Sequence, residues 1–322
     1  MNRRTFVCSA AAASATFLIV APPVYSESGF PNKPIELVVP YPAGGGTDVL
    51  ARAFAEASRK HMNQTMLVMN RPGAGGAIGI NDMIRSKPDG YKLSVITTDL
   101  LTLPLLGLAK FNYEDVQPIA QLNYDPSAVT VRADAPWNTI GEFLKAAKAF
   151  PSNMRIGNSG SGSIWHIAAT ALEEKTGAKF THVPFQGASP AVLALIGGHI
   201  DAVTVSPAEV ASHVKAGKLK MLVVMSDQRI KGHEKVPTAK EAGIDVNVGT
   251  WRAIAAPKGT PPEVVAKLRE IAAKAAAEQS FKDVVNKQEL GYAYADGPSF
   301  KATLVKDNTS FKQLIGKLNV TP

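Results

Sequence analysis

The sequence predicts an α/β protein of two lobes, and three observations predict it. Short apolar runs alternate with helical patterns along nearly the whole chain, which is typical of parallel sheets joined by crossover helices. The length of 322 residues fits two such sheets better than one. Two apolar stretches, residues 117–131 and 246–256, are placed to cross between lobes. We therefore expect residues 27–124 and 250–322 in lobe one, and residues 125–249 in lobe two.

The expected elements follow from hydrophobic periodicity. The strands are expected at residues 35–39, 66–69, 92–97, 129–131, 155–156, 202–205 and 221–224. The helices between them are expected at residues 48–60, 78–86, 140–149, 164–175 and 190–196. An alanine-rich helix over 263–278 and a last helix over 298–317 complete the chain.

Composition excludes several classes of function. The chain is 45% hydrophobic and 19% charged, which favours buried cores over disorder. Its only cysteine, Cys8, precedes the expected mature chain, so disulfides, thiolate catalysis and cysteine-ligated zinc are excluded there. Basic residues are spread out and do not cluster with aromatic residues, so we expect no nucleic-acid partner. We expect a monomer with no cofactor and no metal.

The N-terminus has the features of an export signal. Arg3 and Arg4 form a basic start, and a mildly apolar run over residues 7–21 leads to two prolines and small residues. We expect cleavage after Ser26, which makes residues 1–26 a signal peptide. The two arginines fit a twin-arginine signal, which exports folded proteins, and equally fit an ordinary secretory signal.

A glycine-rich run follows the first expected strand, from Val39 to Asp48 (VPYPAGGGTD). Thr47 is placed to cap the helix that begins at Asp48. The first N–H groups of a helix lack partners within it and the dipole is positive there, so an anion above them is stabilised. Glycines let a ligand approach the backbone closely. The run therefore indicates an anion site, with a plain tight turn as the alternative.

The second junction, Asn70 to Gly79 (NRPGAGGAIG), approaches the dinucleotide fingerprint without matching it. Its third glycine lies one position late, and the acid expected about 20 residues later is not on a convincing second strand. No phosphate loop of the Gly-x4-Gly-Lys type is present in the sequence. A nucleotide site is therefore not expected.

The third junction, Gly157 to His166 (GNSGSGSIWH), places serine hydroxyls beside the start of another helix. An exported serine hydrolase that uses Ser161 or Ser163 with His166 is one alternative for this segment. The Gly-x-Ser-x-Gly elbow of such enzymes is absent, and no acid partner is recognisable. We expect His166 to be a packed or hydrogen-bonded histidine.

The fourth junction, Pro184 to Pro190 (PFQGASP), offers Ser189 as an N-cap before Pro190 in the first turn. All four junctions thus join a strand to a helix, two in each expected lobe. Such junctions lie at the carboxyl ends of strands, where α/β proteins bind ligands. Helix N-termini from both lobes should face one cleft. This arrangement suits a ligand that carries an anionic group, or an anionic group at each of its two ends.

The energetics of such a cleft are sufficient without a buried cation. One helix N-terminus contributes up to about 2 kcal/mol to a partly buried anion. Micromolar affinity needs about 8 kcal/mol, which two or three helix ends, direct hydrogen bonds and lobe closure supply together. A contribution of Arg71 and Arg252 to binding is an alternative, and we expect both to lie on the surface.

These segments together resemble the Bug-type (TctC-like) periplasmic receptors of tripartite tricarboxylate transporters, in the family's order and over essentially the whole mature chain. The matching segments are Pro31–Ile35, Val38–Asp48, Asn70–Gly76, Pro88–Tyr91, Gly160–His166, Pro184–Gly187, Gly197–Asp201 and Ala255–Pro261.

The resemblance implies a type II periplasmic-binding-protein fold, in which two crossing strands join two α/β lobes. It implies a receptor without catalytic activity that captures a small carboxylate (a di- or tricarboxylate or an aromatic acid) and hands it to the membrane subunits of the transporter. It also implies that Asp48 holds its loop or a water rather than the anion. The expected ligand-binding residues are Tyr41, Ala43, Gly44, Gly45, Thr47, Asp48, Gly75, Thr98, Ser159, Gly160, Ser161, Gln186, Gly187, Ala188 and Ser206.

One segment departs from the family pattern. The family often has a small-residue loop and an Asn-Pro pair after the third strand, where this chain has Thr97 to Pro104 (TTDLLTLP). Asp99 favours a ligand with an amine or hydroxyl if it faces the cleft, or it caps a helix. A ligand sensor that docks on a membrane histidine kinase would share the same fold, so it stays a further alternative.

Overall fold

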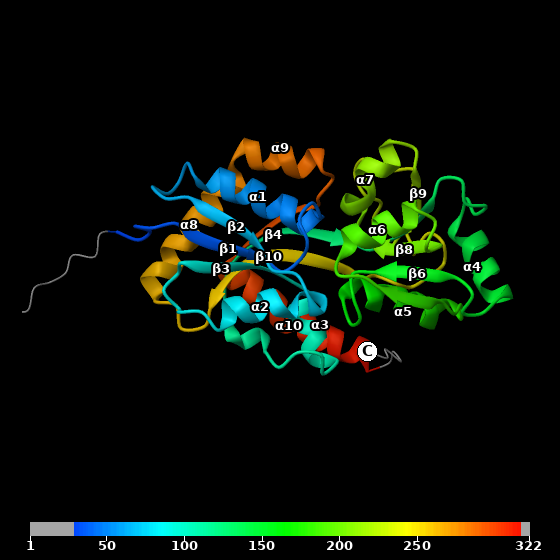
Figure 1. Cartoon of the computed structure of the whole chain (residues 1–322), viewed down its shortest axis with the longest axis horizontal. Coiled ribbons are helices and arrows are strands. Elements are labelled where there is room, and N and C mark those ends of the chain that lie inside the picture. The colour runs from blue at the N-terminus through cyan, green and yellow to red at the C-terminus, as the bar shows by residue number, and fades with distance from the viewer. Residues whose placement is uncertain (1–28, 317–322) are drawn as a thin grey trace, which may run out of the picture. The chain divides into compact units, whose positions relative to one another are not determined.

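Within residues 29–316, which the computed structural model describes, the strands form two sheets. We call the six-stranded sheet with its helices lobe one, and the five-stranded sheet with its helices lobe two (Figure 1). The first sheet has the order β11-β4-β10-β3-β1-β2, and the second has the order β7-β6-β8-β5-β9. The expected signal peptide lies outside the described residues.

Most strands match the expected apolar runs, but the strands at Thr181–Pro184 and Tyr292–Asp296 were not expected. Lobe one contains β1 (Ile35–Val39), β2 (Met66–Asn70), β3 (Lys92–Thr97), β4 (Val116–Pro126), β10 (Gly249–Pro257) and β11 (Tyr292–Asp296). Lobe two contains β5 (Ala128–Arg132), β6 (Arg155–Asn158), β7 (Thr181–Pro184), β8 (Ala202–Val205) and β9 (Leu219–Val224).

The helices cover both faces of the first sheet. In lobe one, α1 (Gly46–Ser58), α8 (Pro262–Ala277) and α9 (Gln279–Lys287) pack together on one face, and α2 (Ala77–Ile84), α3 (Asp99–Leu105) and α10 (Gly297–Ile315) lie on the other (Figure 1). Lobe two contains α4 (Ile140–Ala149), α5 (Ile164–Thr176), α6 (Ala188–Ile196) and α7 (Pro207–Lys215). Short 3-10 turns lie at Ala74–Gly76 and Tyr113–Asp115.

The expectation of parallel sheets is wrong, because both sheets are mixed. β1 is parallel to its neighbours β2 and β3, but β10 is antiparallel to β3 and β4, and β5 is antiparallel to β8 and β9. The chain leaves lobe one along β4 and returns along β10, so these two paired strands must run in opposite directions. The two expected crossing segments are therefore confirmed.

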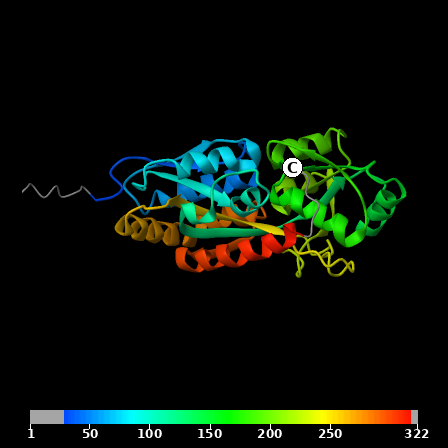
Figure 2. The same cartoon turned by 90° about the horizontal axis from the view of Figure 1, so that it is seen from below.

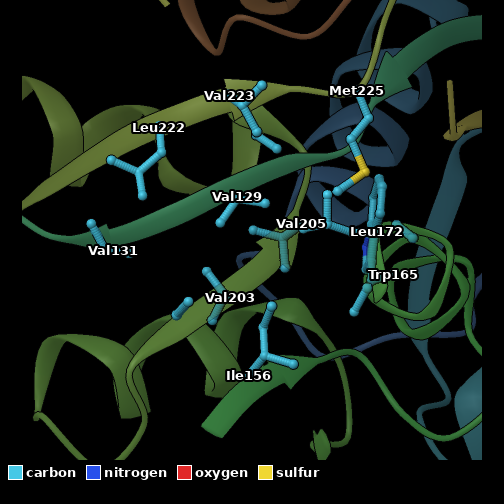
Figure 3. Close-up of a cluster of buried hydrophobic side chains, with 14 of the residues drawn as sticks. Val129, Val131, Ile156, Trp165, Leu172, Val203, Val205, Leu222, Val223 and Met225 are labelled. Carbon is cyan, nitrogen blue, oxygen red and sulfur yellow. The ribbon is translucent and has the colours of Figure 1, made fainter. Parts of the chain in front are cut away.

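Lobe two has its own hydrophobic core between its sheet and its helices. Figure 3 shows Val129, Val205 and Ile156 of the sheet together with Trp165 and Leu172 of α5. Local signals set the ends of α5: the Ser163 hydroxyl accepts the His166 N–H at 3.3 Å, and Gly177 closes the helix at φ +71°. The amino end of α5 is thus held at the carboxyl end of β6.

A third connection joins the lobes besides the two crossings. α10 runs along the first sheet toward lobe two (Figure 2). Phe311, Leu314 and Ile315 near its end pack against the core of lobe two. No helix within residues 29–316 is both long and apolar enough to cross a membrane.

The segment from Thr97 to Pro104, which stands where the family often has a loop, is mostly helix α3. Its Leu100, Leu101 and Leu103 are buried against residues of β10 and α10, and this burial outweighs the helix-breaking effect of Pro104.

The exact boundaries of the lobes, 124/125 and 249/250, stay a prediction.

Candidate functional site

A cavity lies between the lobes at the carboxyl ends of β1, β3 and β6. Its free volume is about 20 Å³, little more than one water molecule needs, so the lobes lie close together around it. It is lined by Tyr41, Pro42, Gly45, Thr47, Thr97, Asp99, Ser159, Ile164, Trp165, Ala188, Ser189, Glu209, Thr250 and Arg252.

Asp48 holds the first glycine loop, as expected. Its carboxylate accepts hydrogen bonds from the Gly44 N–H at 3.0 Å, from Arg52 at 3.0 Å and from Asn70 at 2.9 Å. Burial raises the pKa of Asp48, but these hydrogen bonds outweigh it and hold the pKa below its ordinary value. Asp48 therefore stays ionised and fixes the turn that carries Gly45 into the cavity wall.

The expected cap at Thr47 is wrong. Helix α1 begins at Gly46, its N-cap residue is Gly45, and no side chain caps it. The Thr47 hydroxyl instead accepts a hydrogen bond from Arg252 Nε at 2.8 Å. The first N–H groups of α1 are thus left without a side-chain cap at the cavity.

The expected surface position of Arg252 is also wrong, because its side chain is only 1% exposed. Its guanidinium donates to Asp125 of the neighbouring strand β4 and lies 3.4 Å from Glu209 of α7 in lobe two. Asp125 also accepts the Gly291 N–H at 2.7 Å. A buried ion cluster therefore joins the two crossing strands to lobe two.

Asp99, which also lines the cavity, joins the lobes as well. Its Oδ1 accepts the Ile164 N–H at the start of α5 at 2.8 Å, and its Oδ2 accepts the Tyr41 hydroxyl at 2.6 Å. Beside it, the Thr102 hydroxyl donates to the Gly162 carbonyl of lobe two at 3.0 Å. Burial raises the pKa of Asp99 to about 6, although the hydrogen bonds to its carboxylate favour the ionised form.

The N–H groups of the third junction are engaged within the chain. Gly160 donates to the Asn158 side chain, Gly162 to His166 Nδ1, and Ile164 to Asp99. The expectation that this junction offers free N–H groups to a ligand is therefore wrong at these positions. Two of these acceptors, Asn158 and His166, are local, and only the Ile164 N–H is engaged from the other lobe, by Asp99.

His166 is packed and hydrogen-bonded, as expected. Its ring lies edge-on to that of His182, with 4.7 Å between centroids, and its Nδ1 accepts the Gly162 N–H at 3.0 Å. Burial lowers the pKa of His166 to about 4, so it is neutral at pH 7. The Ser163 hydroxyl accepts the backbone N–H of His166 rather than facing its ring, which is not the geometry of a serine–histidine pair.

The start of α6 faces the first loop. α6 begins at Ala188 with Gly187 as N-cap residue, so the expected cap at Ser189 is wrong. A β-carbon on Gly187 would lie 2.7 Å from Pro42 Cδ, and one on Gly45 would lie 3.1 Å from Ser189 Oγ. The N-termini of α1 and α6, one from each lobe, therefore meet at the cavity.

A second cavity of about 190 Å³ adjoins the first and shares Ser189 and Glu209 with it. Its wall includes Ala43 and Gly44 of the first loop together with residues of α6 and α7.

The structure brings part of the expected ligand-binding set together. Tyr41, Gly45, Thr47, Ser159 and Ala188 line the first cavity, and Ala43 and Gly44 line the second. The others lie outside both linings as the structure describes them. These are Asp48, Gly75, Thr98, Gly160, Ser161, Gln186, Gly187 and Ser206.

The expected ligand-binding residues outside the two cavities have other surroundings. A β-carbon on Gly160 would lie 3.4 Å from the Cα of Gly75, so these glycines touch across the lobes. Thr98 is buried and donates to Thr250 at 3.0 Å. Gln186 is exposed. Their role as ligand contacts stays a prediction.

Glu209 is the most informative residue that sequence reasoning missed. The run Ser206-Pro207-Ala208-Glu209 has the spacing of a capping box with proline in the first turn, which predicts the start of α7 after β8. The Ser206 N–H does donate to Glu209 at 3.3 Å. The placement of Glu209 beside Arg252 has no local signal.

The buried Glu209 predicts a pH-dependent stability. Burial raises the pKa of Glu209 to about 7, although Arg252 opposes this. Its stabilising contribution is then complete below the unfolded pKa near 4.5 and is lost as the pH rises through 7. Between pH 4.5 and 7.5, the wild type should lose on the order of 3 kcal/mol of unfolding free energy more than Glu209→Gln.

Urea unfolding of both proteins across this pH range measures the difference. The comparison cancels the opposite contribution of His166, whose lowered pKa costs stability as the pH falls. Glu241→Gln is the matched control, because hydrogen bonds from Thr238 and Arg229 lower the pKa of that exposed glutamate. Parallel pH profiles for wild type and Glu209→Gln would contradict the prediction.

Comparison with known proteins places this architecture in a family. The chain is 31% identical to the protein BugT of Bordetella pertussis over 254 residues, which are 77% of this chain and 78% of BugT. The structure of a TctC solute binding protein from Polaromonas, determined with no ligand, is 59% identical with a TM-score of 0.68. That match covers 90% of this chain and 100% of the other.

A second solved structure agrees in fold. MatC from Rhodopseudomonas palustris with bound malate is 27% identical with a TM-score of 0.82, over 89% of this chain and 100% of that one. The family model described as "Tripartite tricarboxylate transporter family receptor" matches residues 50–320. The sequence resemblance and the two-lobe fold expected from it are confirmed, and the proteins of this family are solute-binding receptors rather than enzymes. The chain belongs to the tripartite tricarboxylate transporter receptor family.

Proposed function

We propose that this protein is a periplasmic receptor that binds a small carboxylate between its lobes and delivers it to the membrane subunits of a tripartite tricarboxylate transporter. The observation that carries the proposal is the meeting of the α1 and α6 N-termini at one interlobe cavity. Uncapped N–H groups and two helix dipoles directed at one point suit a carboxylate. The malate bound to MatC supports this class of ligand.

The tight contact between the lobes supports a closed arrangement. The Polaromonas protein, without ligand, has a lower TM-score than MatC with malate, although its sequence is far more similar to this chain. A different angle between two otherwise similar lobes lowers the TM-score of a superposition of the whole chain, even when the sequences are similar. Hinged closure is the usual motion of two-lobed binding proteins.

The remaining parts of the proposal follow from the family and the sequence. Receptors of this family are periplasmic, and we propose the periplasm for this chain as well. We also propose that it acts as a monomer without a nucleic-acid partner, and that the cavity-lining members of the expected set contact the ligand.

Thermal unfolding against a panel of carboxylates tests the proposal. The panel comprises C3 to C6 mono-, di- and tricarboxylates and small aromatic acids, each with its amide as an uncharged control. A ligand at 100 times its Kd adds about 2.7 kcal/mol, which corresponds to a rise in Tm of roughly 5 °C. Native mass spectrometry of the freshly purified protein identifies any acid retained from the cell.

No shift with any acid, together with no retained acid, would exclude carboxylate binding. Delivery is tested separately. Uptake of the identified acid by vesicles that contain the membrane subunits should require this protein, and uptake without it would exclude the delivery role.

A further inference from the structure

A second cluster of charged side chains joins the lobes, apart from the one around Arg252. Glu289 lies between α9 and β11 and so belongs to lobe one. One of its carboxylate oxygens lies 2.6 Å from Lys215 Nζ at the end of α7, and the other accepts a hydrogen bond from His233 Nε2. His233 is followed by Val236, which packs against the core of lobe two. Both partners of this lobe-one carboxylate therefore come from lobe two.

We call Glu289, Lys215 and His233 the interlobe triad. The side chains of Glu289 and His233 are only 10% and 8% exposed, whereas Lys215 is 58% exposed. Salt screens partly buried charges weakly, and a carboxylate that loses its partners there keeps the cost of its burial. A rotation that carries lobe two away would separate Glu289 from both partners at once. The triad therefore favours the closed orientation of the lobes.

The backbone of Glu289 is an independent indication that its side chain is needed. Glu289 follows Gln288, the C-cap residue of α9, and has φ +56°, in the left-handed region. The Leu290 N–H donates to the Val285 carbonyl at 2.9 Å, which completes a helix ending where glycine is the favoured residue. A glutamate is locally unfavourable at this position. Such a conformation persists when tertiary contacts hold it, and here the contacts are those with lobe two.

The triad lies beside one of the two crossing strands. Two residues after Glu289, the Gly291 N–H donates to Asp125 Oδ1 at 2.7 Å, and its carbonyl accepts the Tyr124 N–H at 2.8 Å. Tyr124 and Asp125 belong to β4, along which the chain leaves lobe one. Glu289 is thus fastened next to the segment about which the lobes must turn. A displacement of about 1 Å breaks a hydrogen bond, so even a small rotation would release the triad.

We propose that the interlobe triad is a latch that populates the closed orientation of the lobes before any ligand binds. A receptor that is partly closed in advance uses less of the ligand's binding free energy for closure, so its apparent affinity rises with the closed fraction. The latch goes beyond the proposed function, since it acts on the lobes themselves and does not depend on which solute they bind.

Double electron–electron resonance on protein freed of retained acids by unfolding and refolding tests the latch. Cys8→Ser removes the chain's only cysteine. Nitroxides on Lys87→Cys of lobe one and Lys148→Cys of lobe two, both exposed positions, then report the separation of the lobes. With Glu289 intact, the closed distance should be a resolved population. Glu289→Gln should lower the ratio of closed to open molecules by about tenfold.

Glu278 supplies a matched control within one lobe. Its carboxylate also pairs with a lysine and a histidine, Lys60 at 2.7 Å and His61 at 2.9 Å, and all three residues belong to lobe one. Glu278→Gln should therefore leave the ratio of closed to open molecules unchanged.

A second variant separates the latch from backbone strain. Glu289→Gly removes the carboxylate but suits φ +56°. It should open the lobes as Glu289→Gln does, and it should lose less stability than Glu289→Gln in urea unfolding. Circular dichroism verifies that each variant is folded.

The distances decide the proposal without reference to a ligand. An unchanged ratio in both folded Glu289 variants overturns the latch, and so do unsubstituted lobes that lack the closed distance. An equal effect of Glu278→Gln overturns it as well, because the opening would then follow from a general loss of stability. Carboxylate binding is decided separately, by the thermal panel.

Discussion

Replacing Arg252 with methionine should lower the free energy of unfolding by about 3–5 kcal/mol. The guanidinium is buried among Asp125, Glu209 and the Thr47 hydroxyl. Methionine fills most of the volume but leaves two buried carboxylates without their cation, which costs more than the ion pairs themselves contribute. Urea unfolding at pH 8, where the carboxylates are ionised, measures the loss.

The control is Arg229→Met, which removes an exposed arginine paired with Glu241 at 3.0 Å. Exposed pairs contribute little, so its loss should stay below about 1 kcal/mol. The cost of Arg252→Met should shrink below pH 5, because Glu209, with a pKa raised to about 7, is then protonated. If the Arg252→Met protein is as stable as Arg229→Met at pH 8, Arg252 and its two carboxylate partners do not make the expected contribution to the free energy of unfolding.

Replacing Gly187 with alanine should force the lobes apart. Gly187 has φ +132° and ψ 172°, a conformation nearly restricted to glycine, and strain there costs about 1–3 kcal/mol. In addition, the new β-carbon would lie 2.7 Å from Pro42 Cδ, and the proline ring cannot turn away as a flexible side chain can. The radius of gyration measured by small-angle X-ray scattering should therefore increase.

Gly177→Ala separates backbone strain from the contact between lobes. Gly177 also lies in lobe two at a positive φ, +71°, but a β-carbon there meets open space. This variant should lose stability and keep the wild-type scattering profile. For an acid identified by the thermal panel, Gly187→Ala should weaken binding at least about tenfold, and Gly177→Ala should not. Identical scattering and affinity in both variants would refute an interlobe role for Gly187.

The local sequence pattern predicted most helices and strands, because burial of one face makes apolar residues recur with the period of a helix or a strand. The bounds of β1, β3, β8 and α4 agree with the expected ranges. The strand β11 was missed because its run YAYAD lacks a continuous apolar stretch, and its identity as a strand comes from pairing with β4. In α3, burial of leucines overrides a proline that locally argues against a helix.

The glycine junctions of the first and fourth loops were found for a similar reason. Glycine followed by a helix start is a local signal, and these loops do line the interlobe cavity through Gly45 and Ala188. The third loop has the same local design, but its N–H groups are engaged by the chain itself. Local sequence predicts where helix N-termini form, and it does not say which of them stay available to a ligand.

The chain's own residues thus predict an α/β protein of two lobes, its family and the loops that approach the cleft. The charge of the cleft emerges only on folding. Arg252 finds Thr47, Asp125 and Glu209 across 205, 127 and 43 residues of sequence, and Asp99 reaches Ile164 across 65. Whether a charged side chain is solvated or buried depends on partners brought together by the two crossing strands, and no local period encodes such partners.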